Sequence, residues 1–229
     1  MSPFVVSPAT AADLKSLAII SRAAFRASTQ SMSYWVFPQE NEEGIYQWRL
    51  RYITNIFHDD PTCSYVKCVD NATGKIVAFA CWESPHPPKT EEQSTNEQQD
   101  KKEGTGEDAF LPEGTNTRLM HDFEAETQRL RNRYVNSEED YVLRAIATLP
   151  EYQGRGCASA LLKAGLEKVD AEGRKAFLEA TPQGHPLYLK FGWRDVDQMA
   201  FDLNTYGFDG RGHVQITTCM MREATKQVK

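Results

Sequence analysis

The chain has 229 residues, with 32 acidic and 26 basic side chains and a net charge of −6. A net negative surface argues against binding to a nucleic-acid backbone, so we expect no nucleic-acid partner. No apolar run of membrane-spanning length and no N-terminal signal segment is recognisable, so we expect a cytoplasmic protein without membrane contact. The five cysteines are odd in number and lie mostly in apolar runs, which is typical of reduced thiols.

The first part of the chain predicts a strand, two helices and a β-hairpin. A short apolar strand at Phe4–Val6 precedes Thr10-Ala-Ala-Asp13, a cap-like segment that opens a helix. A second helix runs from about Glu42 to His58, because its apolar residues recur with helical spacing. Two strands flank a turn rich in Asp, Asn and Gly, as in a hairpin. Their ranges are Thr62–Val69 and Lys75–Trp82.

The middle of the chain is polar. The stretch Lys89–Asp108 contains no aliphatic or aromatic side chain and is rich in Glu, Gln, Ser and Thr. Such a segment cannot bury enough apolar surface to become ordered. We therefore expect a single domain over residues 1–229 with a disordered insertion at about 84–116.

The second part of the chain predicts alternating strands and helices. The expected elements are a helix at Arg118–Tyr134, a strand at Tyr141–Thr148, a helix from Ala158 to Gly173, a strand at Ala176–Ala180, a short helix from Pro186 to Gly192, and strands at Trp193–Leu203 and His213–Met221. Taken with the first part, this order predicts an α/β (α+β) fold in which helices cover both faces of a mixed central sheet.

The segment Tyr141–Leu162 combines an apolar strand, a turn with Pro150, a Gly-x-Gly loop and an Ala- and Leu-rich helix. Glycines at 154 and 156 let backbone N–H groups approach an anion without interference from a Cβ atom. The following helix presents its unpaired first-turn N–H groups and its positive dipole end to the same place. The segment therefore predicts a phosphate or pyrophosphate site.

Two other phosphate-binding motifs fit less well. A Walker loop requires a Lys directly after its last glycine, and Gly156 is followed by Cys157. A Rossmann fingerprint is closer, since Gly154-x-Gly156-x-x-Ser159 nearly matches it and Glu179 stands where a ribose-binding acid would be expected. However, too little chain follows the loop for a second mononucleotide-binding half.

Two linked motifs favour a third interpretation. Gln153–Ala158 reads Gln-x-x-Gly-x-Ala, and Leu187–Trp193 reads Leu-Tyr-Leu-Lys-Phe-Gly-Trp. Together with Leu149–Tyr152, they resemble the GNAT superfamily of acetyl-CoA-dependent N-acetyltransferases, whose second motif is L-Y-x-K-x-G-F. The resemblance covers nearly the whole chain and implies a GNAT-like mixed central sheet. The departure is the stretch Ser84–Tyr134, which the common family core lacks and where acceptor specificity is partly expected.

The resemblance implies which residues hold acetyl-CoA, the co-substrate. The backbone of the Gly loop would bind its pyrophosphate, and the preceding strand would offer main-chain groups along its pantetheine arm. The residues implied for the loop are Gln153, Gly154, Arg155, Gly156, Cys157 and Ala158, and those for the strand are Ala145, Ile146, Ala147 and Thr148. Of these, Arg155 fits a solvated surface charge as well as a phosphate partner.

Acetyl transfer to an amine also requires an acid for the leaving thiolate and a route for the amine proton. Tyr188 matches the general-acid tyrosine of the family, and a phenol with a pKa of about 10 is protonated at neutral pH. Many family members carry a Glu on the strand before the Gly loop, but Tyr141–Thr148 contains no carboxylate. Candidates for the base are Glu179, then His121, and a water chain to bulk solvent.

The acceptor amine is expected beside the link between the first two helices. This link, from Phe25 to Pro38, borders the acceptor cleft in the family and contains Tyr34 and Trp35. Clustered aromatic rings bind apolar or cationic groups, although packing of the link onto the core explains them equally well. We expect no metal site, because the spacing of Cys63 and Cys68 within one strand puts their thiols on opposite faces.

The resemblance thus implies an N-acetyltransferase that moves the acetyl group of acetyl-CoA to an amine of a small molecule or peptide, by direct attack in a ternary complex. A non-catalytic acyl-CoA-binding or sensing module on the same fold is the competing interpretation, and a nucleotide-dependent oxidoreductase is a more distant one. The identity of the acceptor, N- versus O-transfer and the oligomeric state stay open at this point.

Overall fold

A computed structural model of the chain describes residues 3–87, 110–208 and 214–225. The segment Lys89–Asp108, for which the sequence predicts disorder, lies outside these described residues, so that expectation stays a prediction.

The centre of the molecule is a seven-stranded mixed sheet with the strand order β1-β2-β3-β4-β5-β7-β6. Strands β4 and β5 run parallel, and all other neighbouring strands pair in antiparallel fashion. The strands are β1 (Phe4–Pro8), β2 (Cys63–Asp70), β3 (Ile76–Glu83), β4 (Tyr141–Thr148), β5 (Ala176–Ala180), β6 (Arg194–Asp202) and β7 (Val214–Arg222).

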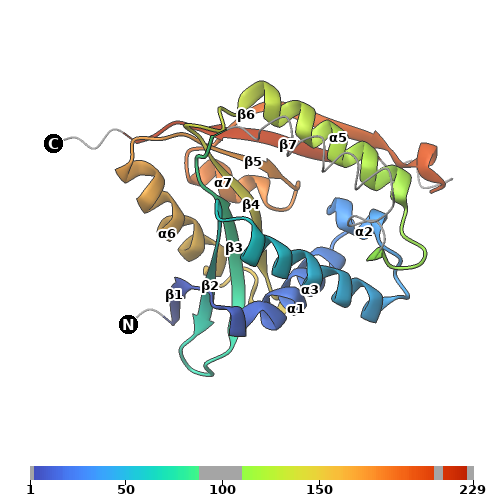
Figure 1. Cartoon of the computed structure of the whole chain (residues 1–229), viewed down its shortest axis with the longest axis horizontal. Coiled ribbons are helices and arrows are strands. Elements are labelled where there is room, and N and C mark those ends of the chain that lie inside the picture. The colour runs from blue at the N-terminus through green and yellow to red at the C-terminus, as the bar shows by residue number, and fades with distance from the viewer. Residues whose placement is uncertain (1–2, 88–109, 209–213, 226–229) are drawn as a thin grey trace.

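Helices cover both faces of this sheet, as the sequence predicts. Figure 1 shows α6 on one side of strands β2 and β3, with α1 and α3 on the other side, while α5 runs along β6 and β7. The helices are α1 (Leu14–Arg26), α2 (Met32–Val36), α3 (Glu42–Asp59), α5 (Thr117–Tyr134), α6 (Cys157–Ala171) and α7 (His185–Lys190).

The local sequence explains where the first helices begin. The backbone N–H and hydroxyl of Thr10 donate to the Asp13 carboxylate at 2.7 and 2.9 Å, which stabilises the turn leading into α1. The Asn41 side chain accepts a hydrogen bond from Gly44 N at 2.9 Å and caps α3. The predicted link from Phe25 to Pro38 contains the short helix α2, which the sequence analysis did not predict.

The core has two parts that meet at the middle of the sheet. One part joins β1 to β5 with α1, α3 and α6, and the other joins β5, β6 and β7 with α2 and α5. Helix α6 lies very close to β3, since a Cβ atom on Gly165 would come within 2.4 Å of the Trp82 ring. This close approach fixes the position of α6, and therefore of the loop before it, against the sheet.

An ion pair between Asp170 and Arg222 ties the end of α6 to β7. Arg222 Nη1 and Nη2 donate to the two carboxylate oxygens at 2.7 and 2.8 Å. The Arg222 side chain is only 7% exposed and that of Asp170 is 20% exposed. The hydrogen bonds from Arg222 hold the pKa of Asp170 below its usual range.

We expect this pair to contribute to acid unfolding. The unfolded-state pKa of Asp170 is about 3.9, so the stabilisation is fully present above that pH and is lost as the pH falls through the lower folded-state pKa. Asp170→Asn should therefore flatten the acid limb of the free energy of unfolding, measured by urea titration from about pH 5 down to pH 2. Glu223→Gln, at the 71% exposed partner of Lys175, is the control. An unchanged acid limb in Asp170→Asn would contradict this assignment.

Candidate active site

The Gly loop joins the end of β4 to the start of α6. Gly154 and Gly156 have φ angles of +72° and +92°, in the left-handed region that favours glycine. Gly156 precedes α6 without a side-chain cap among the described residues, so the first-turn N–H groups of this helix stay available. A Cβ atom on either glycine would meet nothing within 4 Å. The space beside both glycines is therefore open, and the uncapped N–H groups of α6 next to it suit a pyrophosphate.

The side chains of the loop fold back onto β4 and β1. Gln153 Nε2 donates to Thr148 O at 3.3 Å, which ties the loop to the end of β4. The Arg155 guanidinium lies 4.6 Å from the centroid of the Tyr152 ring and 5.8 Å from that of Phe4. Cys157 is buried, so only its backbone can face a ligand.

Strands β4 and β5 separate next to this loop. Their parallel pairing ends at Leu143 and Leu178, although β4 continues to Thr148 and β5 to Ala180. Beyond Leu143, the edge of β4 that faces β5 pairs with no strand of the described residues. The sequence-predicted segment 145–148 lies on this open edge, with Ala145 and Ile146 partly exposed.

A β-bulge interrupts β4 where the two strands separate. Cys81 pairs with Ala145 and Trp82 pairs with Leu143, which leaves Arg144 as the extra residue. Such a bulge frees backbone groups from the ladder and redirects side chains. Here it turns Arg144 toward Tyr52 of α3.

Tyr188 of α7 is buried, and its ring packs edge-on against Trp193 with a centroid distance of 5.8 Å. Burial raises the pKa of the Tyr188 phenol above its ordinary value, and the nearby charge of Glu179 raises it further. The hydroxyl is therefore protonated throughout the neutral pH range. Within the described residues, no side chain accepts a hydrogen bond from it, so it is able to donate to a ligand.

Glu179 of β5 is held by Arg131 of α5. Arg131 Nε and Nη2 donate to the two carboxylate oxygens at 2.7 and 2.8 Å, and the Glu179 side chain is only 10% exposed. Both carboxylate oxygens are thus engaged by a cation, so Glu179 is a paired carboxylate in the structure. His121, the other candidate base, is an exposed residue of α5.

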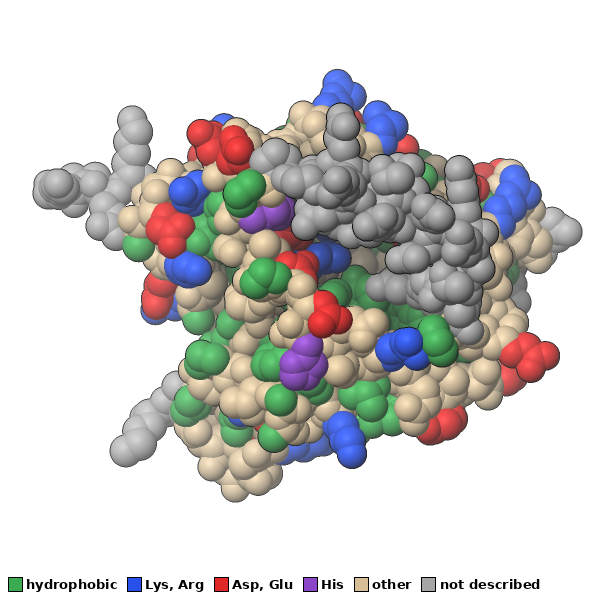
Figure 2. All heavy atoms as spheres, in the orientation of Figure 1, with side chains coloured by type: hydrophobic (Ala, Val, Ile, Leu, Met, Phe, Trp, Pro, Cys, Tyr) green, Lys and Arg blue, Asp and Glu red, His purple; other side chains and the backbone are tan. Residues whose placement is uncertain are grey.

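The structure also assembles a charged cluster that the sequence analysis missed. Arg144 Nη1 lies 3.6 Å from Asp60 Oδ2 and 3.5 Å from Glu83 Oε2, and Arg144 Nη2 lies 3.5 Å from the Tyr52 hydroxyl. A hydrogen bond with Cys81 and the charge of Arg144 lower the pKa of Cys63 beside them. Figure 2 shows a hollow on this face next to α3, with charged and apolar side chains around it.

The predicted acceptor link divides into a buried part and an accessible part. Trp35 is buried, and its Nε1 donates to Thr29 O at 2.8 Å, so it fastens the link to the core. Tyr34 and Phe25 are only partly buried. Phe25 lies beside α3, with its ring centroid 5.8 Å from the guanidinium carbon of Arg49.

The model of the acetyltransferase (GNAT) family matches residues 23–193, a range that includes the Gly loop and Tyr188. The chain belongs to this family. The resemblance stated from the two motifs is therefore confirmed. Among curated protein sequences, none matches this chain.

Solved structures with the same fold include several acetyltransferases. A crystal structure from Corynebacterium glutamicum, described as histone acetyltransferase HPA2 and related acetyltransferase, has a TM-score of 0.60 and 21% identity, covering 100% of both chains. An arylalkylamine N-acetyltransferase like 5b from mosquito has a TM-score of 0.58 and 16% identity, covering 96% of this chain and 99% of the other. These likenesses confirm the predicted fold class.

One structure of this GNAT fold contains coenzyme A. It is the PaiA N-acetyltransferase from Thermoplasma acidophilum, with a TM-score of 0.51 and 12% identity, covering 96% of this chain and 98% of the other. At this identity the likeness extends to the fold alone. The Gly loop of the present chain nevertheless suits a phosphate group on its own geometry, because its glycines border open space and the first-turn N–H groups of α6 have no side-chain cap among the described residues.

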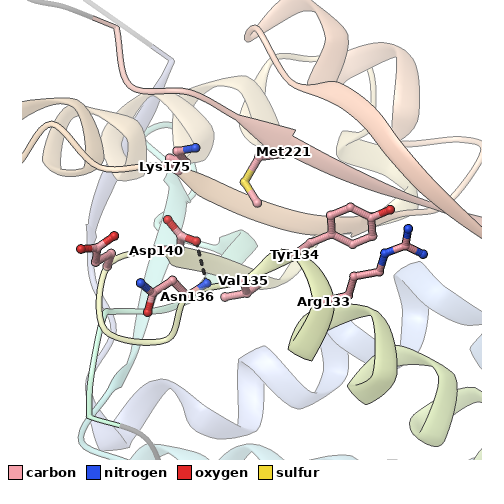
Figure 3. A pocket seen from close by; sticks show the side chains of 8 residues that line it. Arg133, Tyr134, Val135, Asn136, Asp140, Lys175 and Met221 are labelled. Carbon is pink, nitrogen blue, oxygen red and sulfur yellow. Dashed lines mark hydrogen bonds between the residues drawn. The ribbon is translucent and has the colours of Figure 1, made fainter.

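A pocket of about 340 Å³ lies at the other end of β4, away from the Gly loop. Figure 3 shows its walls, with Tyr134 and Arg133 from the end of α5 and Met221 from β7. Asp140, just before β4, accepts a hydrogen bond from Asn136 N at 2.8 Å there. Its charged side chains are of both signs and none belongs to the predicted site, so this pocket is separate from the family's motifs.

Two further findings concern the described residues alone. No group of His, Cys, Asp or Glu among them is arranged to hold a metal ion, and the five cysteines are free thiols. No helix in the described ranges is both long and apolar enough to cross a membrane.

Proposed function

We propose that the chain is an N-acetyltransferase that transfers the acetyl group of acetyl-CoA to an amine of a small molecule or peptide. The observation that carries this proposal is the combination of three features around β4 and β5: the open Gly loop, the separation of the two strands, and the buried Tyr188 phenol near Glu179 of β5, whose hydroxyl has no side-chain partner among the described residues. The family assignment supports acyl transfer, and the name of the mosquito structure supports an amine acceptor.

In this proposal the donor lies along the open edge of β4. The N–H groups of residues 154–158 bind its pyrophosphate, with Arg155 at the rim of the loop and Gln153 holding the loop in place. The main-chain groups of Ala145, Ile146, Ala147 and Thr148 hydrogen-bond to the pantetheine arm, as an added strand would do. The reacting carbonyl then reaches the bulge at Arg144.

The chemistry requires stabilisation of an oxyanion and protonation of the leaving sulfur. Backbone N–H groups at the bulge are suited to the first task, since the bulge removes them from regular pairing. Tyr188 performs the second task by donating its proton as charge develops on sulfur. The backbone N–H groups and the Tyr188 hydroxyl are both in place before the reaction, so little reorganisation energy is needed to reach the transition state.

The amine must lose a proton before it attacks. Glu179 is near Tyr188, but Arg131 occupies both of its carboxylate oxygens. Because Glu179 is paired in this way, we expect the amine to lose its proton to water in the hollow and not directly to Glu179. The role left to Glu179 is electrostatic, through its negative charge near Tyr188. Phe25 and Tyr34 contact the acceptor body in this proposal, while Trp35 anchors the link behind them.

The first test compares ligands by thermal stability. A ligand at about 100 times its dissociation constant adds roughly 2.7 kcal/mol to the free energy of unfolding, so acetyl-CoA should raise Tm by several degrees. NAD and ATP at equal concentration should not. Mass spectrometry of amine mixtures incubated with acetyl-CoA should then show products heavier by one acetyl group.

Each outcome of this test has a distinct meaning. Stabilisation by NAD without stabilisation by acetyl-CoA would refute the proposal and favour the oxidoreductase interpretation. Stabilisation by acetyl-CoA without any acetylated product would indicate a non-catalytic acyl-CoA-binding module. We further propose that the protein acts in the cytoplasm, because five unpaired thiols suit a reducing compartment.

A further inference from the structure

Arg49 of α3 lies inside a box of aromatic rings. Its guanidinium carbon is 4.8 Å from the centroid of the Trp48 ring, 5.1 Å from that of Phe37 and 5.8 Å from that of Phe25. Its Nη2 donates to the Ser33 hydroxyl, while its Nε is buried and has no hydrogen-bond partner among the described residues. Of the five N–H donors of this guanidinium, the one on Nε therefore has no acceptor among the described residues.

Within the described residues, no carboxylate lies within 4.0 Å of Arg49. Three other largely buried arginines do have carboxylate partners. Arg131 pairs with Glu179, Arg144 with Asp60 and Glu83, and Arg222 with Asp170. Burial lowers the pKa of Arg49 to about 10, so the group still carries its charge at neutral pH. A buried charge without a counter-ion is costly, which makes this site a strong attractor for an anion.

The Arg49 site is connected to the point of acetyl transfer by adjacent side chains. Tyr52, one turn further along α3, stacks on Trp48 with a centroid distance of 5.4 Å and an interplanar angle of 15°. The Tyr52 hydroxyl lies 3.5 Å from Nη2 of Arg144, the bulged residue of β4. Trp48 and Tyr52 therefore form a continuous aromatic wall between the bulge and Arg49.

The charges along this wall are asymmetric. At its bulge end, Asp60 and Glu83 lie close to Arg144, so that positive charge is compensated. At its other end, no carboxylate of the described residues compensates the positive charge of Arg49. A molecule with a cationic amine at the bulge, an apolar middle and an anionic group at Arg49 would match each part of the wall.

We propose that Arg49 determines acceptor specificity by pairing with a carboxylate, so that the acceptor is an amine that also carries a carboxyl group and an apolar body between the two. This class includes amino acids with apolar side chains and ω-amino acids. The part of this inference that concerns the amine rests on the proposed acetyl transfer. The part that concerns the carboxylate rests on Arg49 alone. Arg49 is partly exposed as a residue, whereas its Nε atom is buried.

A purely structural role for Arg49 is the competing explanation, since cation–π contacts could hold α1, the link and α3 together. The two explanations differ in what Arg49→Met changes. A structural role would lower Tm and affect all acceptors alike. A specificity role would leave Tm unchanged or raise it, because an unpaired buried charge is removed, and would affect only carboxylate-bearing acceptors.

The test uses matched acceptor pairs, phenylalanine with phenethylamine and 5-aminovalerate with pentylamine. We expect the wild type to prefer the carboxylate member of a pair. Arg49→Met should lower kcat/KM for that member by about 10- to 100-fold, mainly through KM, and leave the other member within about threefold. Arg49→Lys should recover part of the loss, because it restores the charge but not the planar fork.

Arg51→Met is the matched control, since Arg51 is an exposed arginine on the same helix. It should change neither selectivity nor affinity. Equal loss for both members of a pair in Arg49→Met, or a wild type without preference for the carboxylate member, would overturn the inference.

A second measurement does not depend on acetyl transfer. Calorimetric titration with 3-phenylpropionate, in the presence of coenzyme A, should show binding to the wild type and to Arg51→Met but not to Arg49→Met. If this pattern holds while no acetylated product forms with any amine, the anion site stands and the proposed function fails. If transfer occurs but 3-phenylpropionate binds the wild type and Arg49→Met equally, the proposed function stands and the role of Arg49 is refuted.

Discussion

Tyr188→Phe should retain the affinity for acetyl-CoA within a few fold and lower kcat by roughly 10²- to 10⁴-fold, the usual contribution of a positioned general acid. The hydroxyl has no protein acceptor among the described residues, so its removal leaves no partner unsatisfied. It matters when charge builds on sulfur and little before that, so the loss should appear in kcat and in kcat/KM equally. Stopped assays at saturating acetyl-CoA measure kcat, and calorimetric titration with acetyl-CoA measures the affinity for the donor.

The pH dependence provides a separate check on Tyr188. A general acid acts in its protonated form, so activity falls as the pH rises through its pKa. Burial and the charge of Glu179 raise the pKa of Tyr188, so this alkaline limb should lie above the ordinary phenol value of about 10. The limb should disappear in Tyr188→Phe.

Tyr141→Phe is the matched control. Tyr141 is also a buried tyrosine, but its hydroxyl donates to Glu172 at 2.8 Å. It is the first residue of β4, whereas the Gly loop follows the last residue of that strand. Its loss should cost about 1 kcal/mol of stability and leave kcat unchanged. If Tyr188→Phe behaves in the same way, Tyr188 is a core residue and another group or water protonates the sulfur.

The sequence predicted the elements whose residues carry a strong local pattern. Strand β4 and strand β5 have the bounds that their apolar runs predict, and the Gly loop has the left-handed residues that Gly154 and Gly156 indicate. The helix α2 was not predicted, because its short span contains less than two turns and shows no helical period. Local pattern thus predicted the bounds of β4 and β5 and the conformation of the Gly loop.

The surroundings of Glu179, Arg144 and Arg49 could not be predicted, because they depend on pairing between elements that are distant in the sequence. The ion pair that occupies Glu179 comes from Arg131, on a helix far from β5 in the sequence. The bulge that turns Arg144 toward α3 is a property of its register with β3. That Arg49 has no carboxylate partner within the described ranges is likewise visible only once the neighbouring helices and strands are in place.

Gly156→Val is expected to abolish binding of acetyl-CoA and coenzyme A in calorimetric titration. A Cβ atom at this position meets nothing within 4 Å, so in the free protein the valine side chain would project into open space in front of the α6 N-terminus. That space is where a pyrophosphate must approach the backbone N–H groups. The methyl groups would block this approach and thereby prevent binding.

Backbone strain is the alternative cause of such a loss, because φ is +92° at Gly156 and a β-branched residue is strained there by about 1–3 kcal/mol. Gly74→Val separates the two causes, since Gly74 in the β2–β3 turn has a φ of +70° and equally open surroundings. Both variants should show a similar drop in Tm, yet only Gly156→Val should lose the donor. Loss of binding in both would indicate general destabilisation. Wild-type affinity in a folded Gly156→Val would remove the Gly loop from the donor site.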